Sequence, residues 1–455
     1  MHYTAITPDQ QRHQLEAIGV GSIDDLFAAI PESSRFQGPL SIPGARSELD
    51  LQRSLDEMAS SNTPATSMSC FAGAGSYDHF IPTFIDQLIS RGEFLTAYTP
   101  YQAEASQGSL QAFFEFQTQI ARLTGMDIAN ASLYDGATSV AEAVNLALNT
   151  TGKRRVLVAS TIHPHSAQVL RTHLEDLPVE YVELPSGADG TVSPAVVAEH
   201  ANDDTACLVL QSPNFLGNIE NWTDAFSALR AASSVGKPPL AIAVTNPIAC
   251  ALLKTPGDCD ADIACGEGQP LGIPMQFGGP YLGFFAAKQS FLRKMPGRLV
   301  GEATDANGRR SFALVLQTRE QHIRGAKATS NVCTNQGLLA LRATMHMTAM
   351  GRQGIREVAE QCWHKAHSLA RRISALEGYS LRHDAQFFNE FVVTCPKPAS
   401  EIISICVQHA ILPGVALNAV GLLPNAEPHD LLIAVTEKRS ADDLDALVNT
   451  LQSIA

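Results

Sequence analysis

The sequence predicts an α/β protein with a mostly parallel β-sheet, and three observations support this fold class. Between residues 154 and 287, short apolar segments alternate with stretches of helical periodicity, which is typical of strands joined by right-handed crossovers. Hydrophobic residues make up 45% of the 455 residues and charged residues 17%, so the chain can bury a large core. A loop rich in Gly and Pro joins the last two apolar segments and indicates a backbone held in one shape.

The chain divides into three predicted parts. Residues 1–60 form a helical N-terminal arm with little core of its own, so we expect the arm to lie against another surface. Residues 61–333 form the large α/β domain. Residues 334–455 begin with a long helix and continue as a small α+β domain. The predicted elements of this small domain are strands at 391–394 and 431–435 and a helix at 441–454.

Strands of the large domain are expected where apolar residues run together between turn signals. They lie at 155–159, 179–184, 206–211, 240–245, 262–265 and 281–286. An open parallel sheet binds ligands beside the carboxyl ends of its strands. His163 lies in one of the loops there, and its ring could stack on a planar ligand. A metal site that combines His163 with His165 lacks a third nearby ligand.

A dense group of polar side chains precedes a predicted helix that starts near residue 109. Phenols, amides, a carboxylate and hydroxyls surround a proline turn, which favours a polar loop at a site over a solvated connector. The candidate site residues are Tyr98, Thr99, Tyr101, Gln102, Glu104, Ser106 and Gln107.

A Gly-Ala-Thr-Ser turn opens an alanine-rich helix near residue 136. Gly136, Thr138 and Ser139 could offer backbone N–H groups and hydroxyls to an anion, with support from the helix dipole. The alternative is an ordinary capping box, in which Glu142 follows a Ser or Thr within one turn. The sequence favours neither interpretation.

A second concentration of polar residues lies at 318–331. Basic residues followed by a Thr-Ser-Asn sequence could bind a carboxylate or the acidic surface of a partner. They could also form a solvated linker into the long helix that begins near residue 334. The candidates are Arg324, Lys327, Thr329, Ser330 and Asn331.

Charge and composition exclude several classes of function. The net charge of −14 disfavours nucleic acid as a partner, because there is no basic stripe to displace counterions. The nine cysteines are scattered without CxxC spacing, so we expect reduced thiols and no metal site. The N-terminus lacks an apolar signal core, and no apolar run approaches membrane-spanning length. We therefore expect a cytoplasmic protein that does not bind membranes.

The Gly- and Pro-rich loop within residues 261–288 has one conspicuous absence. In many proteins that bind pyridoxal phosphate, a loop between two such strands carries the lysine that forms the Schiff base. No lysine occurs between Asp262 and Ala287. The sequence therefore predicts the frame of such a site without its reactive lysine.

Five long motifs follow one another along the chain. They are FAGAGSYDHFIP (71–82), YTPYQAEASQGSL (98–110), YDGATSVAEA (134–143), GEGQPLGIPMQFGGPYLGFFA (266–286) and TREQHI…KATSNVCTNQ (318–336). In type and order they resemble the P-protein family of the glycine cleavage system, specifically subunit 1, the alpha subunit, of its two-subunit bacterial form. The resemblance covers essentially the whole chain. One departure is Gly325-Ala326, where the family usually has Arg-Glu, and it weakens a charge role for that segment.

The resemblance implies an aspartate aminotransferase-like fold, the type I fold of transferases that depend on pyridoxal phosphate. In this family the P-protein decarboxylates glycine and passes the aminomethyl group to the lipoyl arm of the H-protein. The resemblance further implies that subunit 2 carries pyridoxal phosphate and its lysine, in an α2β2 heterotetramer. This chain would be an oxidoreductase subunit, inactive alone, whose loop at 98–107 completes the active site and the substrate channel.

The residues of this sequence agree with that division. Gln269 lies about where the lysine would be, and Asn246 occupies the strand end where such enzymes usually place an aspartate that pairs with the pyridine nitrogen. An amide cannot hold a pyridinium as a carboxylate does. With His163 these residues are degenerate cofactor positions, and no bound cofactor is expected here.

Two alternatives remain open from sequence. The chain could be a non-catalytic scaffold or regulatory pseudoenzyme of the same fold. It could also be an autonomous enzyme that binds pyridoxal phosphate through Lys288 or Lys327.

Overall fold

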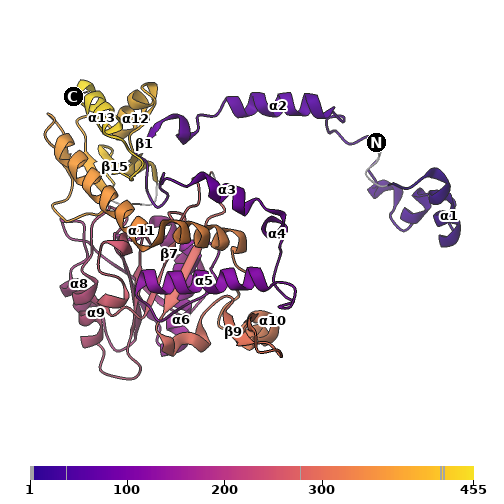
Figure 1. Cartoon of the computed structure of the whole chain (residues 1–455), viewed down its shortest axis with the longest axis horizontal. Coiled ribbons are helices and arrows are strands. Elements are labelled where there is room, and N and C mark those ends of the chain that lie inside the picture. The colour runs from indigo at the N-terminus through magenta and orange to yellow at the C-terminus, as the bar shows by residue number, and fades with distance from the viewer. Residues whose placement is uncertain (1–4, 37, 277, 421–422, 424–425, 455) are drawn as a thin grey trace. The chain divides into compact units, whose positions relative to one another are not determined.

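The computed structural model describes residues 5–36, 38–276, 278–420, 423 and 426–454 (Figure 1). The chain separates into two compact units, Met1–Thr63 and Pro64–Ala455. Among the described residues, no helix combines the length and the apolar character needed to cross a lipid bilayer.

The first unit is helical and has no interior of its own. Its helices are α1 (Pro8–Ile18) and α2 (Glu48–Ser60), with short turns at η1 (Asp24–Phe27) and η2 (Glu32–Ser34). A capping box between Thr7 and Gln10 starts α1. No described side chain of this unit is buried, and many of its large apolar side chains, such as Phe27, are exposed. The unit therefore lacks the buried apolar surface that stabilises a domain.

The second unit is organised around a seven-stranded sheet with the order β2-β8-β7-β6-β5-β3-β4. Its strands are β2 (Ile128–Ala129), β3 (Arg155–Ala159), β4 (Glu180–Leu184), β5 (Thr205–Gln211), β6 (Leu240–Val244), β7 (Ile263–Glu267) and β8 (Gly283–Ala287). Strands β3 to β7 pair in parallel, whereas β8 and β2 pair antiparallel at one edge. The predicted mostly parallel sheet is confirmed, and the six predicted strands end within two residues of the observed bounds.

Helices cover both faces of this sheet (Figure 1). They are α5 (Gln107–Thr124), α6 (Gly136–Thr151), α7 (Pro164–Leu174), α8 (Pro194–His200), α9 (Trp222–Ala231) and α11 (Gly337–Ile373). Alternation along β8 separates the two cores, because successive side chains of a strand point to opposite faces. Phe285 packs with apolar residues of α6, α7 and α9, and Phe284 packs with those of α5 and α11.

The remaining elements surround this sandwich. Short helices α3 (Thr83–Ile89), α4 (Gly92–Leu95) and α10 (Gln321–Arg324) and the hairpin β9 (Val300–Thr304) with β10 (Arg310–Leu314) belong to the large domain. The C-terminal part contains β11 (Ser380–Leu381), β12 (Glu390–Thr394), β14 (Val415–Ala416), β15 (Asp430–Ala434), α12 (Ala399–Gln408) and α13 (Ala441–Ile454). Strands β11, β12, β15 and β14 form an antiparallel sheet, while β1 (Ser69–Cys70) pairs with β13 (Ile411–Leu412).

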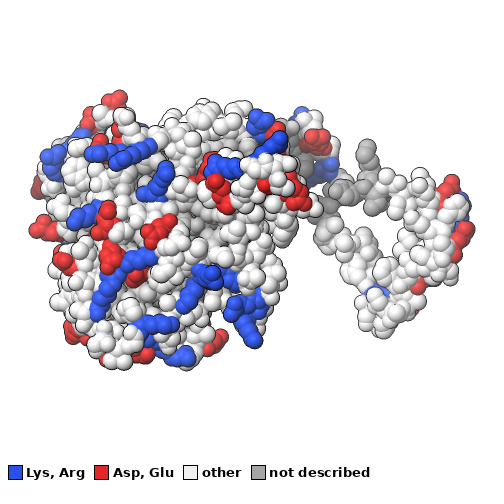
Figure 2. All heavy atoms as spheres, turned by 60° about the horizontal axis from the view of Figure 1, so that its bottom comes forward, with Lys and Arg blue, Asp and Glu red and all other residues white. Residues whose placement is uncertain are grey.

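Charged side chains are distributed without a dominant sign over the face shown in Figure 2. Lys and Arg are interspersed there with Asp and Glu rather than gathered into one continuous stripe. This face offers no track of the kind that follows a nucleic-acid backbone.

Candidate active site

A cavity of about 510 Å³ lies at the carboxyl ends of the parallel strands. Its walls come from the ends of β5, β6 and β7, from the first turns of α6 and α7, and from the segment 74–77. The lining residues considered below are Gly136, His163, Gln211, Asn246 and Glu267. The position agrees with the general location of ligand sites in open α/β sheets.

His163 is fixed at the rim of this cavity as a neutral ring. Its backbone N–H donates to Oε1 of Gln211 at 2.8 Å, and its Nδ1 accepts the backbone N–H of His165 at 3.1 Å. The remaining nitrogen, Nε2, lies 2.9 Å from the carbonyl oxygen of Ala74 and therefore donates to it. Burial lowers the pKa of His163 to about 4. An uncharged, immobile ring suits stacking on a planar group.

Glu267 places a carboxylate at the N-terminus of α6. Its Oε2 accepts the N–H of Gly136 at 3.0 Å, and its Oε1 accepts those of Gln269 and Leu282 at 2.9 Å each. Burial raises the pKa of Glu267 to about 7, although these N–H groups act in the opposite direction. A Cβ atom at position 136 would lie 2.8 Å from the backbone nitrogen of Glu267, so this approach requires glycine. Glu267 was not among the predicted site residues, although an acid at the end of a buried strand is a recognisable signal.

The other donors of the predicted anion turn are also engaged within the chain. The N–H of Thr138 donates to Oδ1 of Asp135 at 2.8 Å, and the hydroxyl of Ser139 donates to the carbonyl oxygen of Asp135 at 2.8 Å. Asp135 is the N-cap residue and forms the capping box with Thr138. The predicted capping role of Glu142 is wrong, because the helix starts earlier and leaves Glu142 two turns inside it. Glu142 is instead buried.

Gln269, which the sequence analysis places about where the lysine would be, is a buried residue that holds two segments together. Its side chain is 1% exposed and bridges the loop that follows β7 to the segment 74–77. Oε1 accepts the N–H of Tyr77 at 2.9 Å, while Nε2 donates to the carbonyl oxygens of Tyr77 at 3.0 Å and Ile273 at 2.7 Å. Both N–H groups and the oxygen of this amide therefore form hydrogen bonds within the chain.

Asn246 lines the cavity just beyond the end of β6. Its Oδ1 accepts the N–H of Ile248 at 3.0 Å and so shapes the turn. The neighbouring Thr245 donates its hydroxyl to the carbonyl oxygen of Ser212 at 2.8 Å. The group at this strand end is an uncharged amide, as the sequence predicted.

Neither lysine of the autonomous-enzyme alternative lines the cavity. The Nζ of Lys288 lies 2.6 Å from Asp260 and 2.9 Å from Asp262, at the opposite end of β7 from Glu267. Lys327 is exposed in the turn η8 (Gly325–Lys327). The structure gives no support to a Schiff base at either position.

The loop at 98–107 does not line this cavity but presents its side chains to the surface. Tyr98 is 92% exposed and Tyr101 is 73% exposed. Gln107 closes the loop, because its side chain donates to the carbonyl oxygen of Phe312 and accepts the N–H of Phe312, at 2.8 Å in both cases. The other candidates also lie outside the cavity: Gln102 and Glu104 are exposed, and Thr99 and Ser106 are half-buried.

The candidates at 318–331 lie mostly on the surface. Arg324 and Lys327 are exposed, and Nε of Arg324 donates to the carbonyl oxygen of Lys327 at 3.1 Å. Gly325 ends α10 with φ of +60°, a conformation that L side chains rarely adopt. The Gly325-Ala326 departure therefore coincides with a turn that favours glycine. The other candidates are exposed Asn331 and half-buried Thr329 and Ser330.

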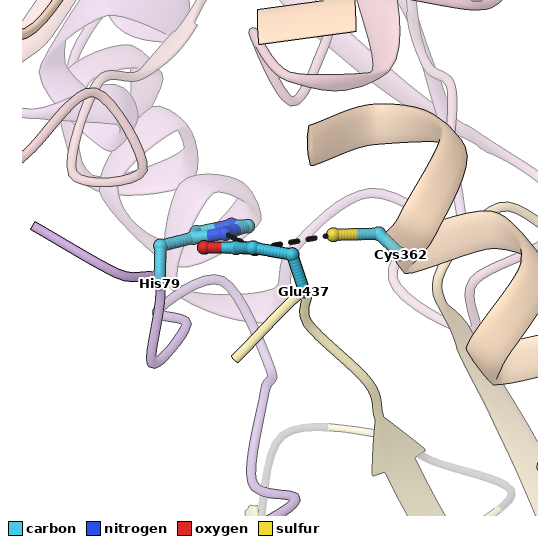
Figure 3. A group of neighbouring side chains, drawn as sticks. All are labelled: His79, Cys362 and Glu437. Atoms are coloured by element: carbon cyan, nitrogen blue, oxygen red, sulfur yellow. Dashed lines mark hydrogen bonds and ion pairs between the residues drawn. The ribbon is translucent and has the colours of Figure 1, made fainter. Parts of the chain in front are cut away.

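A buried cluster of three side chains, His79, Cys362 and Glu437, lies outside the cavity (Figure 3). The Glu437 carboxylate accepts hydrogen bonds from Nδ1 of His79 at 2.7 Å and from the thiol of Cys362 at 3.4 Å. Burial and the adjacent carboxylate hold the pKa of Cys362 well above its ordinary value, so the group is a thiol that donates to Glu437. We interpret the cluster as a structural hydrogen-bond network.

Comparison with known proteins decides the family. The family model described as "Glycine cleavage system P-protein" matches residues 1–451. The chain belongs to the glycine cleavage system P-protein family. It is 47% identical over 453 residues to the "Probable glycine dehydrogenase (decarboxylating) subunit 1" of Thermomicrobium roseum, with 99% of each chain covered. It is 46% identical over 452 residues to the protein of the same name from Bacillus cereus strain AH187, again with 99% of each covered.

Solved structures confirm the predicted fold class for this P-protein chain. A crystal structure of glycine decarboxylase (P-protein), in inhibitor-bound form, superposes with a TM-score of 0.89 at 40% identity and covers 100% of both chains. A mutant of the cystine C-S lyase C-DES, with glycine covalently linked to the pyridoxal phosphate cofactor, superposes with a TM-score of 0.63. At 15% identity over 85% of this chain and 96% of that one, C-DES shows the fold alone. Recognition of the P-protein family from sequence is thus confirmed, and the designation "subunit 1" implies a second subunit.

Proposed function

We propose that the chain is the cofactor-free half of a glycine decarboxylase and acts with a second subunit that carries pyridoxal phosphate. Pyridoxal phosphate supplies the electron sink for loss of CO2 when it is bound in that partner. The pair assembles as an α2β2 heterotetramer in the bacterial cytoplasm, and the lipoyl arm of the H-protein accepts the aminomethyl group. The names of the full-length bacterial relatives support the two-subunit arrangement.

One observation carries the assignment of the cofactor to the partner: the carboxylate of Glu267 occupies the α6 N-terminus. A phosphate bound there would need the N–H groups of the first turn, and it would meet a buried carboxylate instead. By the family resemblance, Gln269 stands about where the lysine would be and Asn246 where the aspartate would be, and both are uncharged amides. Pyridoxal phosphate does not fit the cavity as these residues build it.

The contribution of this chain to the reaction is the loop at 98–107. Its phenols are exposed on a chain whose own cavity cannot hold the cofactor, so they are available to a site completed by the partner. Glycine loses its carboxylate as CO2, and a site that holds this group while excluding water favours the reaction. Tyr98 and Tyr101 are donors that can orient a carboxylate without bringing the large hydration shell of an ammonium group.

The first test concerns the cofactor. The purified chain, incubated with excess pyridoxal phosphate and then reduced with borohydride, is expected to retain no covalently attached pyridoxyl group by mass spectrometry. The co-purified pair is expected to retain the label on the partner subunit alone. Label on Lys288 or Lys327 of this chain would favour the autonomous-enzyme alternative.

The second test concerns the loop. In the reconstituted pair with lipoylated H-protein, the double replacement of Tyr98 and Tyr101 by Phe is expected to lower glycine–bicarbonate exchange about 10- to 100-fold, because misplaced substrate loses reactive geometry. The matched control is Tyr181→Phe, which removes a phenol of β4 that has no hydrogen-bond partner among the described residues. Unchanged exchange after substitution throughout 98–107 would leave a scaffolding role.

A further inference from the structure

Arg298 is a buried cation directly behind the loop at 98–107. It lies between η6 (Gln289–Lys294) and β9 and is 5% exposed. Gly297 precedes it with φ of +69°, and the carbonyl oxygen of Arg298 accepts the N–H of Ala131 at 2.9 Å. The turn at Gly297 and this backbone hydrogen bond therefore hold the backbone that carries the guanidinium in place.

Only neutral oxygens surround the guanidinium. Nη1 donates to Oγ1 of Thr99 at 3.4 Å, to Oγ1 of Thr334 at 3.1 Å and to Oδ1 of Asn335 at 3.2 Å. Nη2 donates to the carbonyl oxygen of Cys333 at 3.3 Å. In the part of the chain that the structure describes, no carboxylate forms an ion pair with it. Both terminal nitrogens of the guanidinium therefore donate hydrogen bonds, but its positive charge has no ion-pair partner among the described residues.

Arg298 differs from the two other arginines whose side chains are almost completely buried. The half-buried Arg319 also has no carboxylate partner among the described residues. Three arginines are classed as buried among the described residues: Arg298, Arg342 and Arg439. Arg342 pairs with Asp86 at 2.7 Å and Arg439 pairs with Asp78 at 2.9 Å. A buried charge normally has such a partner, because removal from water is costly. The charge of Arg298 is therefore free to act on an anion from outside the chain.

The surroundings of Arg298 are pre-organised. Nδ2 of Asn335 donates to the carbonyl oxygen of Ala131 at 2.7 Å, which turns Oδ1 of the same amide toward the guanidinium. The exposed ring of Tyr101 lies on the outer side, with its centroid 5.9 Å from Cζ of Arg298. The positive charge is thus held behind the phenol that the proposed function places at the shared active site.

We propose that Arg298 is the specificity-determining residue that selects a carboxylate at the face of the loop 98–107. This inference rests on the proposed function, in which that face completes the glycine site. Of the two substrates, glycine carries a carboxylate, whereas the dithiolane of a lipoyl arm is uncharged. Arg298 acts through the field of its fixed charge and through Thr99 and Tyr101, without contacting the reacting bond. Arg298 therefore affects the binding of glycine, and its replacement changes KM more than kcat.

The experiment uses the reconstituted pair with lipoylated H-protein. Arg298→Met is expected to raise KM for glycine about 10-fold while kcat changes less than 3-fold, and Arg298→Lys is expected to restore most of the affinity. Two inhibitors distinguish the two ends of glycine: acetate resembles its carboxylate end and methylamine resembles its amino end. Acetate inhibition should weaken about 10-fold in Arg298→Met, while inhibition by methylamine should change less than 2-fold. The matched control is Arg171→Met, which removes an exposed arginine that lies over the ring of Tyr181.

The exchange assay also distinguishes glycine from bicarbonate as the source of the anion. A rise in KM for bicarbonate, with KM for glycine unchanged, would overturn the assignment to glycine. If the Arg298→Met chain does not assemble with its partner, the Thr334→Asp variant tests the proposal instead. This variant retains the arginine and places a carboxylate beside it, which neutralises its charge. Thr334→Asp is then expected to raise KM for glycine about 10-fold. If acetate and methylamine binding weakened equally, or if only kcat fell, the proposal would be wrong and the role of Arg298 would be structural.

The loop variants separate this inference from the proposed function. If the Tyr98 and Tyr101 double variant lowers exchange while Arg298→Met leaves KM for glycine unchanged, only the role of Arg298 is lost. If neither variant alters exchange, the shared-site proposal itself is wrong.

Discussion

Replacing Gln269 by lysine is expected to destabilise the chain by about 3–5 kcal/mol without restoring a cofactor site. The amide accepts one backbone hydrogen bond and donates two in a pocket where it is 1% exposed. A lysine donates but cannot accept, so the N–H of Tyr77 loses its partner. The ammonium would also be buried, at the cost of its hydration.

The matched control for this prediction is Gln289→Lys, the same change at an exposed position. Urea denaturation of both variants measures the free energies of unfolding, and borohydride reduction with pyridoxal phosphate measures covalent attachment. Gln289→Lys is expected to stay within about 0.5 kcal/mol of the parent protein. A stable Gln269→Lys protein that retains a pyridoxyl label would contradict this prediction, because it would show that the cavity lacked only a lysine to bind the cofactor covalently.

Replacing Glu437 by glutamine is expected to lower the free energy of unfolding by about 3 kcal/mol at pH 7. The carboxylate accepts hydrogen bonds from His79 and from the N–H of Phe80, each at 2.7 Å, and from Cys362. It thereby joins the segment that follows β1, helix α11 and the residues after β15. A glutamine retains the volume but withdraws the negative charge from His79.

The pH dependence of this effect has a definite sign. Burial alone would raise the pKa of Glu437, but the charge and hydrogen bond of His79 and the N–H of Phe80 lower it to about 2. A carboxyl group with a depressed folded-state pKa stabilises the protein fully above its unfolded pKa, about 4.5, and loses this contribution as pH falls toward 2.

Urea denaturation at several pH values measures that dependence. The difference in unfolding free energy between the parent protein and Glu437→Gln should shrink as pH falls from 5 toward 2. Glu377→Gln is the control, because Glu377 is exposed. A difference that grows as pH falls from 5 toward 2 would contradict the stabilising role assigned to the ionised Glu437 carboxylate.

The sequence predicted the central sheet well because buried parallel strands appear as continuous apolar runs. The segment 155–159 was placed to the residue, whereas β2, with only Ile128 and Ala129, is too short to give such a run. Local patterns also missed the kink at Gly351, where φ of +61° interrupts α11. A single glycine in a helical pattern does not reveal whether the backbone bends there.

The site was predicted less completely, because its chemistry depends on contacts between distant segments. The absence of a lysine and the amide at Asn246 could be predicted from the sequence, because each position lies directly beside a predicted strand. The hydrogen bond between Glu267 and the N–H of Gly136 could not be predicted from the sequence, because it forms only when the fold brings the end of β7 to the start of α6. The same holds for His79, Cys362 and Glu437, whose spacing along the chain carries no signal.

The carboxylate at the start of α6 has a consequence for how the chain depends on vitamin supply. A protein that binds a dissociable cofactor gains folding free energy in proportion to RT ln(1 + [L]/Kd), so its stability varies with the concentration of that cofactor. Glu267 satisfies the same helix end with a covalently attached group that is always present. If the partner alone binds pyridoxal phosphate, as proposed, the folding of this half does not depend on the concentration of vitamin B6.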